Sequence, residues 1–378
     1  MSRVKVFLVF YSMFLVLLAG CRDDNNPELP PSAGPQAMFG ANLQRTGLYE
    51  TEGLDEVEGV KWRFQTGEWV FTTPAIVDES VYFGSYDGNL YAASAATGAE
   101  EWRFATGDVI VSSPAVAGGS VYVGGVDGNL YAVDADTGAE EWRFATQGAI
   151  TGSPAVSNGL VYVGSDDGHL YAVDAGTGEL AWQFDTGQVI AFSPAIADGV
   201  LYTGSANGIL YALALDTGQE LWRLDTEASM TTGPVIHEGR LYFFGTRPDQ
   251  GTGVLYAVDA ESHAILWQFN TPNENFSSPA IANDVIYWGS LDGNLYAVDI
   301  RTGEARWQFP TQGVVFGAPA VADRTVYFGS FDQYLYAVDA HTGRQKWRFL
   351  TGGGVSSPAL SDGVLYVGSD DGVLYALH

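Results

Sequence analysis

Residues 150–184 read ITGSPAVSNGLVYVGSDDGHLYAVDAGTGELAWQF, and this stretch decides the fold. It holds four short runs rich in β-branched and aromatic residues, separated by residues that favour turns. We therefore expect four antiparallel strands joined by tight hairpins. Asp167-Gly168 suits a two-residue type I′ turn between the second and third strands. We assign Asp167 to this turn rather than to a calcium loop, because the further ligands of such a loop are missing.

The same unit recurs along the chain with a tryptophan near its end. Successive tryptophans of this set are 40 residues apart, except for one interval of 45. A period of this length with four strands per unit is typical of β-propeller blades. The tryptophans that mark the eight units are Trp62, Trp102, Trp142, Trp182, Trp222, Trp267, Trp307 and Trp347.

Each unit also has a proline in its first strand. Proline has no N–H to donate, so within a sheet it is confined to an edge or a bulge. We therefore expect the first strand of each unit to be the innermost edge of its blade, facing a central channel. The prolines are Pro74, Pro114, Pro154, Pro194, Pro234, Pro279, Pro319 and Pro358.

The two ends of the repeat predict how the ring closes. A strand of the fourth type, Val60 to Phe64, precedes the first unit, whereas the chain ends at His378 after a strand of the third type. The N-terminal strand should complete the last blade, because closure hides both pairing edges. We therefore expect an all-β fold, an eight-bladed β-propeller of four-stranded antiparallel blades over residues 59–378, with a lead-in segment at 39–58.

Residues 1–20 read as a lipoprotein signal peptide, with two basic residues followed by an apolar run that is short for a membrane span. The run ends in Leu-Ala-Gly before Cys21, which resembles a bacterial lipobox. We expect cleavage before Cys21 and lipid on that residue. Residues 21–38 would then be a flexible tether. The alternative is an uncleaved signal anchor with an incidental cysteine.

The charge of the chain limits the partners that it can have. The formal net charge is −28, from 17 Lys and Arg against 45 Asp and Glu. Nucleic acid and anionic lipid surfaces would repel such a field, so we expect no nucleic-acid partner. Basic partners and a salty habitat both agree with the excess of acid. The alternative is that the excess of acidic residues serves only to keep the protein soluble.

A longer motif connects the third and fourth strands. It reads Ala-x-Asp-x-x-Thr-Gly-x-x-x-Trp at 132–142, 172–182, 297–307 and 337–347. This motif resembles the tryptophan-docking motif of the PQQ-like propeller repeat family, which includes quinoprotein dehydrogenases and the lipoprotein B subunit of the outer-membrane barrel-assembly machine. Residues 39–47 resemble the lead-in of many members. The resemblance implies that each of the eight tryptophans packs between neighbouring blades, in the core.

The departures from this motif gather in a few units. Ser94 and Ala214 stand where the motif has Asp, and Ser262-His263 replaces Thr-Gly in the fifth unit. The fifth unit also holds five extra residues, around 246–253. We interpret this region as a candidate partner-facing loop, with neutral drift as the alternative.

The resembled family contains both enzymes and scaffolds. Its quinoprotein members use calcium and a stacked quinone, and often a disulfide between adjacent cysteines, whereas Cys21 is the only cysteine here. Units of 40 residues leave loops that are too short for a lid over a cofactor. No pair of histidines has metal-ligand spacing. We therefore expect no catalytic residue, no metal site and neither PQQ nor calcium as a cofactor.

The residues just before the prolines vary most between units. If the first strands line the channel, these residues form an apolar, partly aromatic ring at one mouth. Exposed aromatic patches commonly mark binding sites, although a simple plug of the channel is the alternative. The candidate partner-binding residues are Trp69, Phe71, Phe192, Phe276 and Phe316.

These observations favour a monomeric, non-catalytic scaffold that binds a protein partner in the cell envelope and is held at the membrane through Cys21. The resemblance suggests outer-membrane protein assembly as its setting. The alternatives are a PQQ- and calcium-dependent quinoprotein dehydrogenase and a propeller that binds a small ligand such as a sugar.

Overall fold

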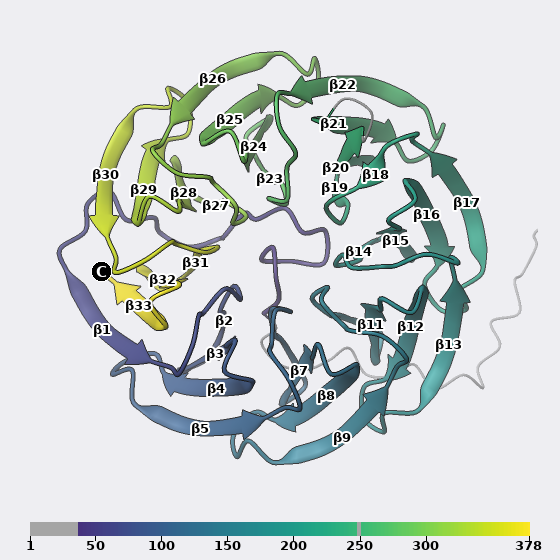
Figure 1. Ribbon diagram of the computed structural model, residues 1–378, viewed down its shortest axis with the longest axis horizontal. Coiled ribbons are helices and arrows are strands. Elements are labelled where there is room, and N and C mark those ends of the chain that lie inside the picture. Colours follow the sequence, from purple (N-terminus) through teal and green to yellow (C-terminus); the bar gives the residue numbers. More distant parts are fainter. Residues whose placement is uncertain (1–36, 248–250) are drawn as a thin grey trace, which may run out of the picture. The chain divides into compact units, whose positions relative to one another are not determined.

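The computed structural model describes residues 37–247 and 251–378. Eight antiparallel sheets, seven of four strands and one with an added fifth strand, surround a central axis like blades (Figure 1). This confirms the all-β, eight-bladed propeller expected from the repeat. No helix within the two described ranges is long and apolar enough to span a membrane. The predicted signal peptide, Cys21 and all of the tether before residue 37 lie outside those ranges.

Each blade begins at the axis with a three-residue strand. The predicted proline directly precedes this strand rather than lying in it, as Pro154 precedes Ala155, so no ladder hydrogen bond is lost to the proline ring. The innermost strands are β2 (Ala75–Val77), β6 (Ala115–Ala117), β10 (Ala155–Ser157), β14 (Ala195–Ala197), β19 (Val235–His237), β23 (Ala280–Ala282), β27 (Ala320–Ala322) and β31 (Ala359–Ser361).

Two longer strands follow in each blade, and both are buried on their two faces because neighbouring blades cover them. The second strands are β3 (Ser80–Gly84), β7 (Ser120–Gly124), β11 (Leu160–Gly164), β15 (Val200–Gly204), β20 (Arg240–Arg247), β24 (Val285–Gly289), β28 (Thr325–Gly329) and β32 (Val364–Gly368). The third strands are β4 (Asn89–Ser94), β8 (Asn129–Asp134), β12 (His169–Asp174), β16 (Ile209–Ala214), β21 (Thr252–Asp259), β25 (Asn294–Asp299), β29 (Tyr334–Asp339) and β33 (Val373–Leu377).

The outer strand of each blade shows one face to solvent, and its residues alternate between exposed and at least half-buried. These strands are β1 (Val60–Gln65), β5 (Glu100–Ala105), β9 (Glu140–Ala145), β13 (Leu180–Asp185), β17 (Glu220–Asp225), β22 (Ile265–Thr271), β26 (Ala305–Pro310) and β30 (Gln345–Leu350). The added strand β18 (Ser229–Met230) pairs with β20 in the fifth blade. We number the blades from the one formed by β2 to β5.

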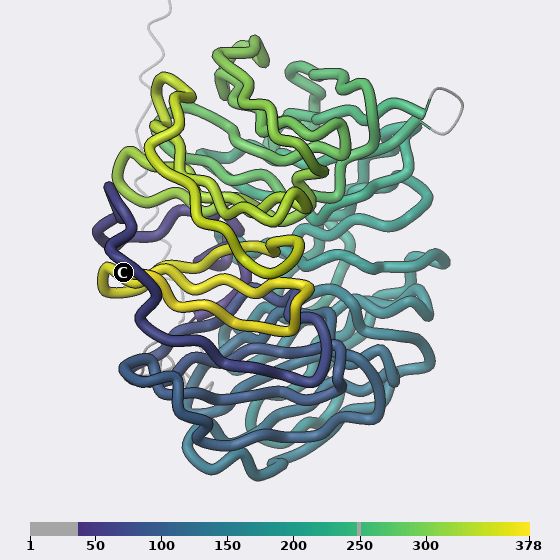
Figure 2. The backbone as a smooth tube through the Cα atoms, turned by 60° about the vertical axis from the view of Figure 1, so that its left-hand side comes forward, coloured from purple at the N-terminus to yellow at the C-terminus, as the bar shows by residue number. Residues whose placement is uncertain are grey.

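The ring closes as the sequence predicts. The eighth blade has the order β1-β33-β32-β31, so the first strand of the propeller completes the last sheet. Trp62 lies opposite Ala376 and Phe64 opposite Leu374 in this ladder. Figure 2 shows the purple segment of β1 running beside the yellow C-terminal strands. The C-terminal strand β33 is thereby paired on both sides, and β1 takes the outer position that β5 and β9 hold in their own blades.

The hydrophobic core is divided into clusters that lie between neighbouring blades. In one cluster, Tyr122 and Leu130 of the second blade pack with Val161 and Tyr171 of the third. Equivalent clusters recur around the ring, because the same positions of the repeat face each blade interface. Each blade is therefore stabilised mainly by its two neighbours.

The type I′ prediction for the Asp-Gly turns is wrong. In the third blade only Gly168 has a positive φ, of 91°, and its N–H bonds to Ser165 O at 3.1 Å, which is a turn that ends in a left-handed glycine. Type I′ geometry instead occurs between the first and second strands, where Asn158 (51°) and Gly159 (73°) both have positive φ. Asp-Gly suits both turns, so the dipeptide alone does not distinguish them.

Candidate functional site

One end of the central channel is covered by the lead-in segment, which runs in purple across the centre of Figure 1. The N–H groups of the innermost strands face the axis, where no further strand of their own blade can accept them. Carbonyl groups of the lead-in segment accept them instead. The pairs are Ile196 N to Leu43 O (2.9 Å), Ile236 N to Gln44 O (3.0 Å), Ile281 N to Thr46 O (2.7 Å) and Val321 N to Gly47 O (2.9 Å).

Arg45 anchors this segment from inside the channel. Its side chain is buried, and it donates from Nε to Pro194 O and from Nη2 to Pro154 O, both at 3.0 Å. Burial lowers its pKa to about 9, which leaves the guanidinium charged at neutral pH. The guanidinium also lies 5.7 Å from the centre of the Phe39 ring. Beneath Phe39 only about 10 Å³ of space remains, so this end of the channel is filled.

The other end opens into a cavity of about 500 Å³, which we call the mouth cavity. Its wall is formed by the loops that lead from an outer strand to the next innermost strand, and Phe39 contributes to its floor. The turns between second and third strands lie on the same face, since Tyr86 N donates to Trp69 O at 2.9 Å. A cavity of this size falls in the range of about 300–1,000 Å³ that is usual for ligand sites.

Six rings form a continuous arc along one side of the mouth cavity. Phe71 stacks on Phe331 at 5.8 Å between ring centres, Phe331 meets Phe316 at 6.3 Å, and Phe316 stacks on Phe276 at 5.9 Å. These spacings are typical of favourable aromatic pairs. We call this set the aromatic arc: Tyr86, Trp69, Phe71, Phe331, Phe316 and Phe276.

The arc crosses the eighth blade because that blade has no side chain in its path. Pro319 and Pro358 are 39 residues apart, so the eighth unit lacks the residue that corresponds to Phe71 or Phe316. A Cβ on Gly354 would lie 3.0 Å from the Phe331 ring, tighter than most Cβ contacts, so the ring would have to shift to make room for it. A deletion and a glycine thus allow Phe331 to reach Phe71.

The opposite side of the mouth cavity is small and polar. Thr73 N donates to Ser113 Oγ, Ser113 N to Ser153 Oγ, and Ser153 N to Ser193 Oγ, each at 2.9 Å. Each of these oxygens accepts a backbone N–H and can still donate its own hydrogen, and all three serines line the cavity. We call Ser113, Ser153 and Ser193 the hydroxyl wall. Thr231, on the same side, has a buried Oγ1 with no partner within the described residues.

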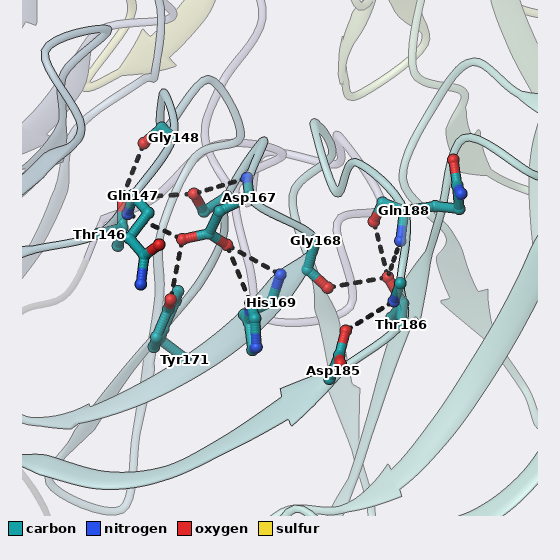
Figure 3. A network of polar contacts seen from close by, with 12 residues as sticks. Thr146, Gln147, Gly148, Asp167, Gly168, His169, Tyr171, Asp185, Thr186 and Gln188 are labelled. Carbon is teal, nitrogen blue, oxygen red and sulfur yellow. Dashed lines mark hydrogen bonds and ion pairs between the residues drawn. The ribbon is translucent and has the colours of Figure 1, made fainter.

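Carboxylates in the hairpin turns hold the loops of the mouth in place. Asp167 Oδ2 accepts from Gln147 N at 2.9 Å and from Tyr171 OH at 2.8 Å, and Oδ1 accepts from His169 N at 2.9 Å (Figure 3). Burial alone would raise the pKa of Asp167, but these hydrogen bonds outweigh it and lower the pKa. Asp87 and Asp127 bond in the same way. The mouth loops are therefore fixed to the next blade.

The structure brings four of the five predicted partner-binding residues together. Trp69, Phe71, Phe276 and Phe316 all belong to the aromatic arc, whereas Phe192 lines the cavity from another blade and packs against the core between the fourth and fifth blades.

Sequence reasoning missed Tyr86 and Phe331. Both precede the aspartate of a hairpin turn, where the other units have Val126, Asp166, Ala206, Leu291 or Asp370. The signal that could have identified them is an aromatic residue at this repeat position, directly before the turn aspartate.

The eight motif tryptophans lie at blade interfaces. Seven donate Nε1 to a backbone carbonyl oxygen. In six the acceptor lies in a turn of the following blade: Trp62 to Ala95, Trp102 to Ala135, Trp142 to Ala175, Trp182 to Leu215, Trp267 to Ile300 and Trp307 to Ala340. Trp347 donates to Leu54 of the lead-in segment. At Trp222 the glycine of the motif is His263, whose ring stacks on the indole at 4.5 Å.

The donor set of the mouth cavity does not fit calcium or PQQ. Calcium needs several carboxylate, amide or carbonyl oxygens around one point, and the tricarboxylate of PQQ needs cationic partners. Among the described residues that line the cavity, no Asp, Glu, Asn, Lys or Arg occurs. Within the described ranges no cluster of three or more His, Cys, Asp or Glu residues could hold a metal ion. The lipidation predicted for Cys21 concerns a residue outside those ranges.

Comparisons with known proteins place this geometry in a family. No curated protein matches the chain significantly. Similar folds occur in the crystal structure of BamB from Moraxella catarrhalis (20% identity, 85% of this chain and 100% of that one, TM-score 0.73). A europium-containing methanol dehydrogenase (16%, 89% and 90%, 0.77) and the quinohemoprotein alcohol dehydrogenase from Comamonas testosteroni (17%, 93% and 81%, 0.76) share the fold as well. The family described as outer membrane protein assembly factor BamB matches residues 53–113, 87–247 and 189–378, and the chain belongs to this family.

Proposed function

We propose that this chain is a non-catalytic envelope scaffold that holds a protein partner at the mouth cavity of its propeller. The observation that carries the proposal is the aromatic arc, in which Trp69, Phe276, Phe316 and Phe331 stay between 39% and 47% exposed although each contacts another ring of the arc. Large apolar side chains grouped in this way on a surface gain stability when a partner covers them.

The side chains of the mouth cavity support binding rather than catalysis. Its wall consists of aromatic rings, hydroxyl groups and small residues, which can enclose and orient a partner. General acid–base or nucleophilic chemistry needs a titratable group or an activated nucleophile beside the substrate. The serines of the hydroxyl wall accept backbone N–H groups, and no base is among the described lining residues to activate them.

The matched family and the N-terminal sequence support a proposal for the setting of this chain. The matched family is described by a role in outer-membrane protein assembly, and we propose the same setting for this chain. We further propose export, cleavage before Cys21 and lipid attachment to that residue, as its Leu-Ala-Gly-Cys junction indicates. Intact-mass analysis tests the anchor: the lipidated form is expected, and a cleaved but unlipidated Cys21 would contradict it.

Site-specific photocrosslinking in the native envelope tests the scaffold role. A benzoylphenylalanine at Phe316 should give a discrete adduct with one partner protein, whereas the same probe at Leu221, an exposed residue of the outer strand β17, should not. Equal crosslinking from both positions would contradict a docking role of the mouth. Dye-linked alcohol oxidation after incubation with PQQ and calcium would contradict the non-catalytic role.

A further inference from the structure

The mouth cavity also restricts the chemistry and shape of its occupant. We infer that it receives a turn or a chain terminus of the partner that carries one or two large apolar side chains flanked by lysine or arginine. This inference rests on the proposed function and adds the partner's chemistry to it. Three features of the described residues carry it: a closed floor, a two-sided wall and an acidic rim.

The closed floor excludes a segment threaded through the ring. Phe39 forms part of the floor, and the space beneath it is filled by Arg45 and the lead-in segment. Hydrogen bonds tie that segment to the innermost strands of the fourth to seventh blades. An entering chain must therefore turn back or end inside the cavity.

The two sides of the wall complement the two parts of a peptide turn. On one side the aromatic arc offers exposed ring faces, which favour aromatic or long aliphatic side chains. On the other side the hydroxyl wall has O–H groups that can donate to carbonyl oxygens, and the buried hydroxyl of Thr231 has no partner among the residues that the structure describes. A turn exposes carbonyl groups that its own hydrogen bonds leave unsatisfied, so the hydroxyl side suits it.

The rim of the cavity carries negative charge with little compensation. In the loops and turns around the mouth, the one described Lys or Arg is Arg247, whose guanidinium bonds to Gln268 and Asn270. Burial raises the pKa of Asp166, and the negative charge of the neighbouring Asp167 adds to the rise. Acidic residues lie in the same loops and hairpin turns as the residues that line the cavity: Glu68, Asp108, Asp166, Glu227, Glu274 and Asp370.

This charge selects among apolar partners. Apart from Asp167 with His169, the ion pairs of the described residues involve other carboxylates: those of the outer strands, those at the third-strand ends and turns of the opposite face, and Asp55 of the lead-in segment. An apolar site inside an acidic rim attracts cationic segments and repels acidic ones, and the attraction is screened by salt. A lysine or arginine beside the inserted side chain would therefore gain the most from the negative potential of the rim.

Calorimetric titration of the full chain in detergent with three cyclic turn peptides tests the inference. The first peptide has a central Phe-Leu pair flanked by lysines, the second has glutamates in place of the lysines, and the third has Ser-Ser in place of Phe-Leu. We expect the first to bind on the order of tenfold or more tighter than either twin. Raising NaCl from about 50 to about 500 mM should weaken it.

Matched variants locate the binding. Phe316→Ser should abolish binding of the lysine peptide, whereas Leu221→Ser, at a similarly exposed outer-strand residue, should not. Glu68→Gln combined with Asp108→Asn should weaken binding several-fold, whereas Asp136→Asn, in an exposed turn of the opposite face, should leave it unchanged.

The outcomes separate the two proposals. Equal affinity of the lysine and glutamate peptides would overturn the inferred chemistry but keep the scaffold. If no peptide binds but Phe316→Ser abolishes the crosslink to an envelope partner, the inferred chemistry is likewise overturned and the scaffold proposal is kept. If neither peptides nor envelope proteins respond to changes in the aromatic arc, the scaffold proposal falls as well.

Discussion

Replacing Trp62 with alanine should lower the free energy of unfolding by about 3–5 kcal/mol, the usual cost of truncating a buried tryptophan. Trp62 lies on β1 in the eighth blade, is 7% exposed, and docks on the first blade through a bond from Nε1 to Ala95 O at 2.9 Å. That bond accounts for about 1 kcal/mol. The rest comes from the indole, which lies so close to Gly98 that a Cβ there would be 2.6 Å from it.

Equilibrium unfolding in urea, followed by circular dichroism, measures this loss when the slope is unchanged between variants. Trp142→Ala is the matched control, because Trp142 docks in the same way, on Ala175 O at 3.0 Å and over Gly178, but between blades that the chain connects directly. In a closed ring both substitutions cost about the same. A loss below about 1 kcal/mol for Trp62→Ala beside 3 kcal/mol or more for Trp142→Ala would refute closure as a source of stability.

Three further predictions concern the ring and its mouth. Gly178→Ala should destabilise the fold more than Gly199→Ala in thermal unfolding: both glycines have φ +73°, but a Cβ would meet Trp142 at 2.8 Å in the first and nothing within 4 Å in the second. Equal losses would mean that the indole adds no constraint. Hydrogen bonds outweigh burial and lower the pKa of Asp87, Asp127 and Asp167 from 3.8, so their contribution to stability should be complete above about pH 4 and be lost as pH falls through their native values. Asp167→Asn should reduce that acid dependence in pH-resolved urea unfolding, and an unchanged profile would contradict the role of these bonds. A chain that begins near Phe71 should melt far earlier than one that lacks only residues 22–35, because the first leaves β33 with a free edge, and equal melting temperatures would contradict this.

The repeat made most of the fold predictable from the sequence. Strand patterns, turn residues and the tryptophan spacing are local features, and each recurs in every unit, so errors in one unit are corrected by the others. The extra strand at Val60–Gln65 and the missing outer strand after β33 also appear in the sequence, which is why ring closure could be predicted. The turn type at Asp167-Gly168 could not be predicted, because Asp-Gly suits both turn types and the Asp167 carboxylate bonds outside its own turn, to Gln147 of the preceding loop.

The candidate site was only half determined by the sequence. Trp69, Phe71, Phe276 and Phe316 precede prolines that mark the axis, so their place at the mouth followed from the repeat. Tyr86 and Phe331 come from separate hairpin turns. Only the structure shows that the one-residue deletion before Pro358 leaves room for Phe331 to reach Phe71. The closed floor likewise exists because the lead-in segment satisfies N–H groups of four blades at once. Such contacts join residues far apart in the chain, and only the curvature of the closed ring brings them to one point.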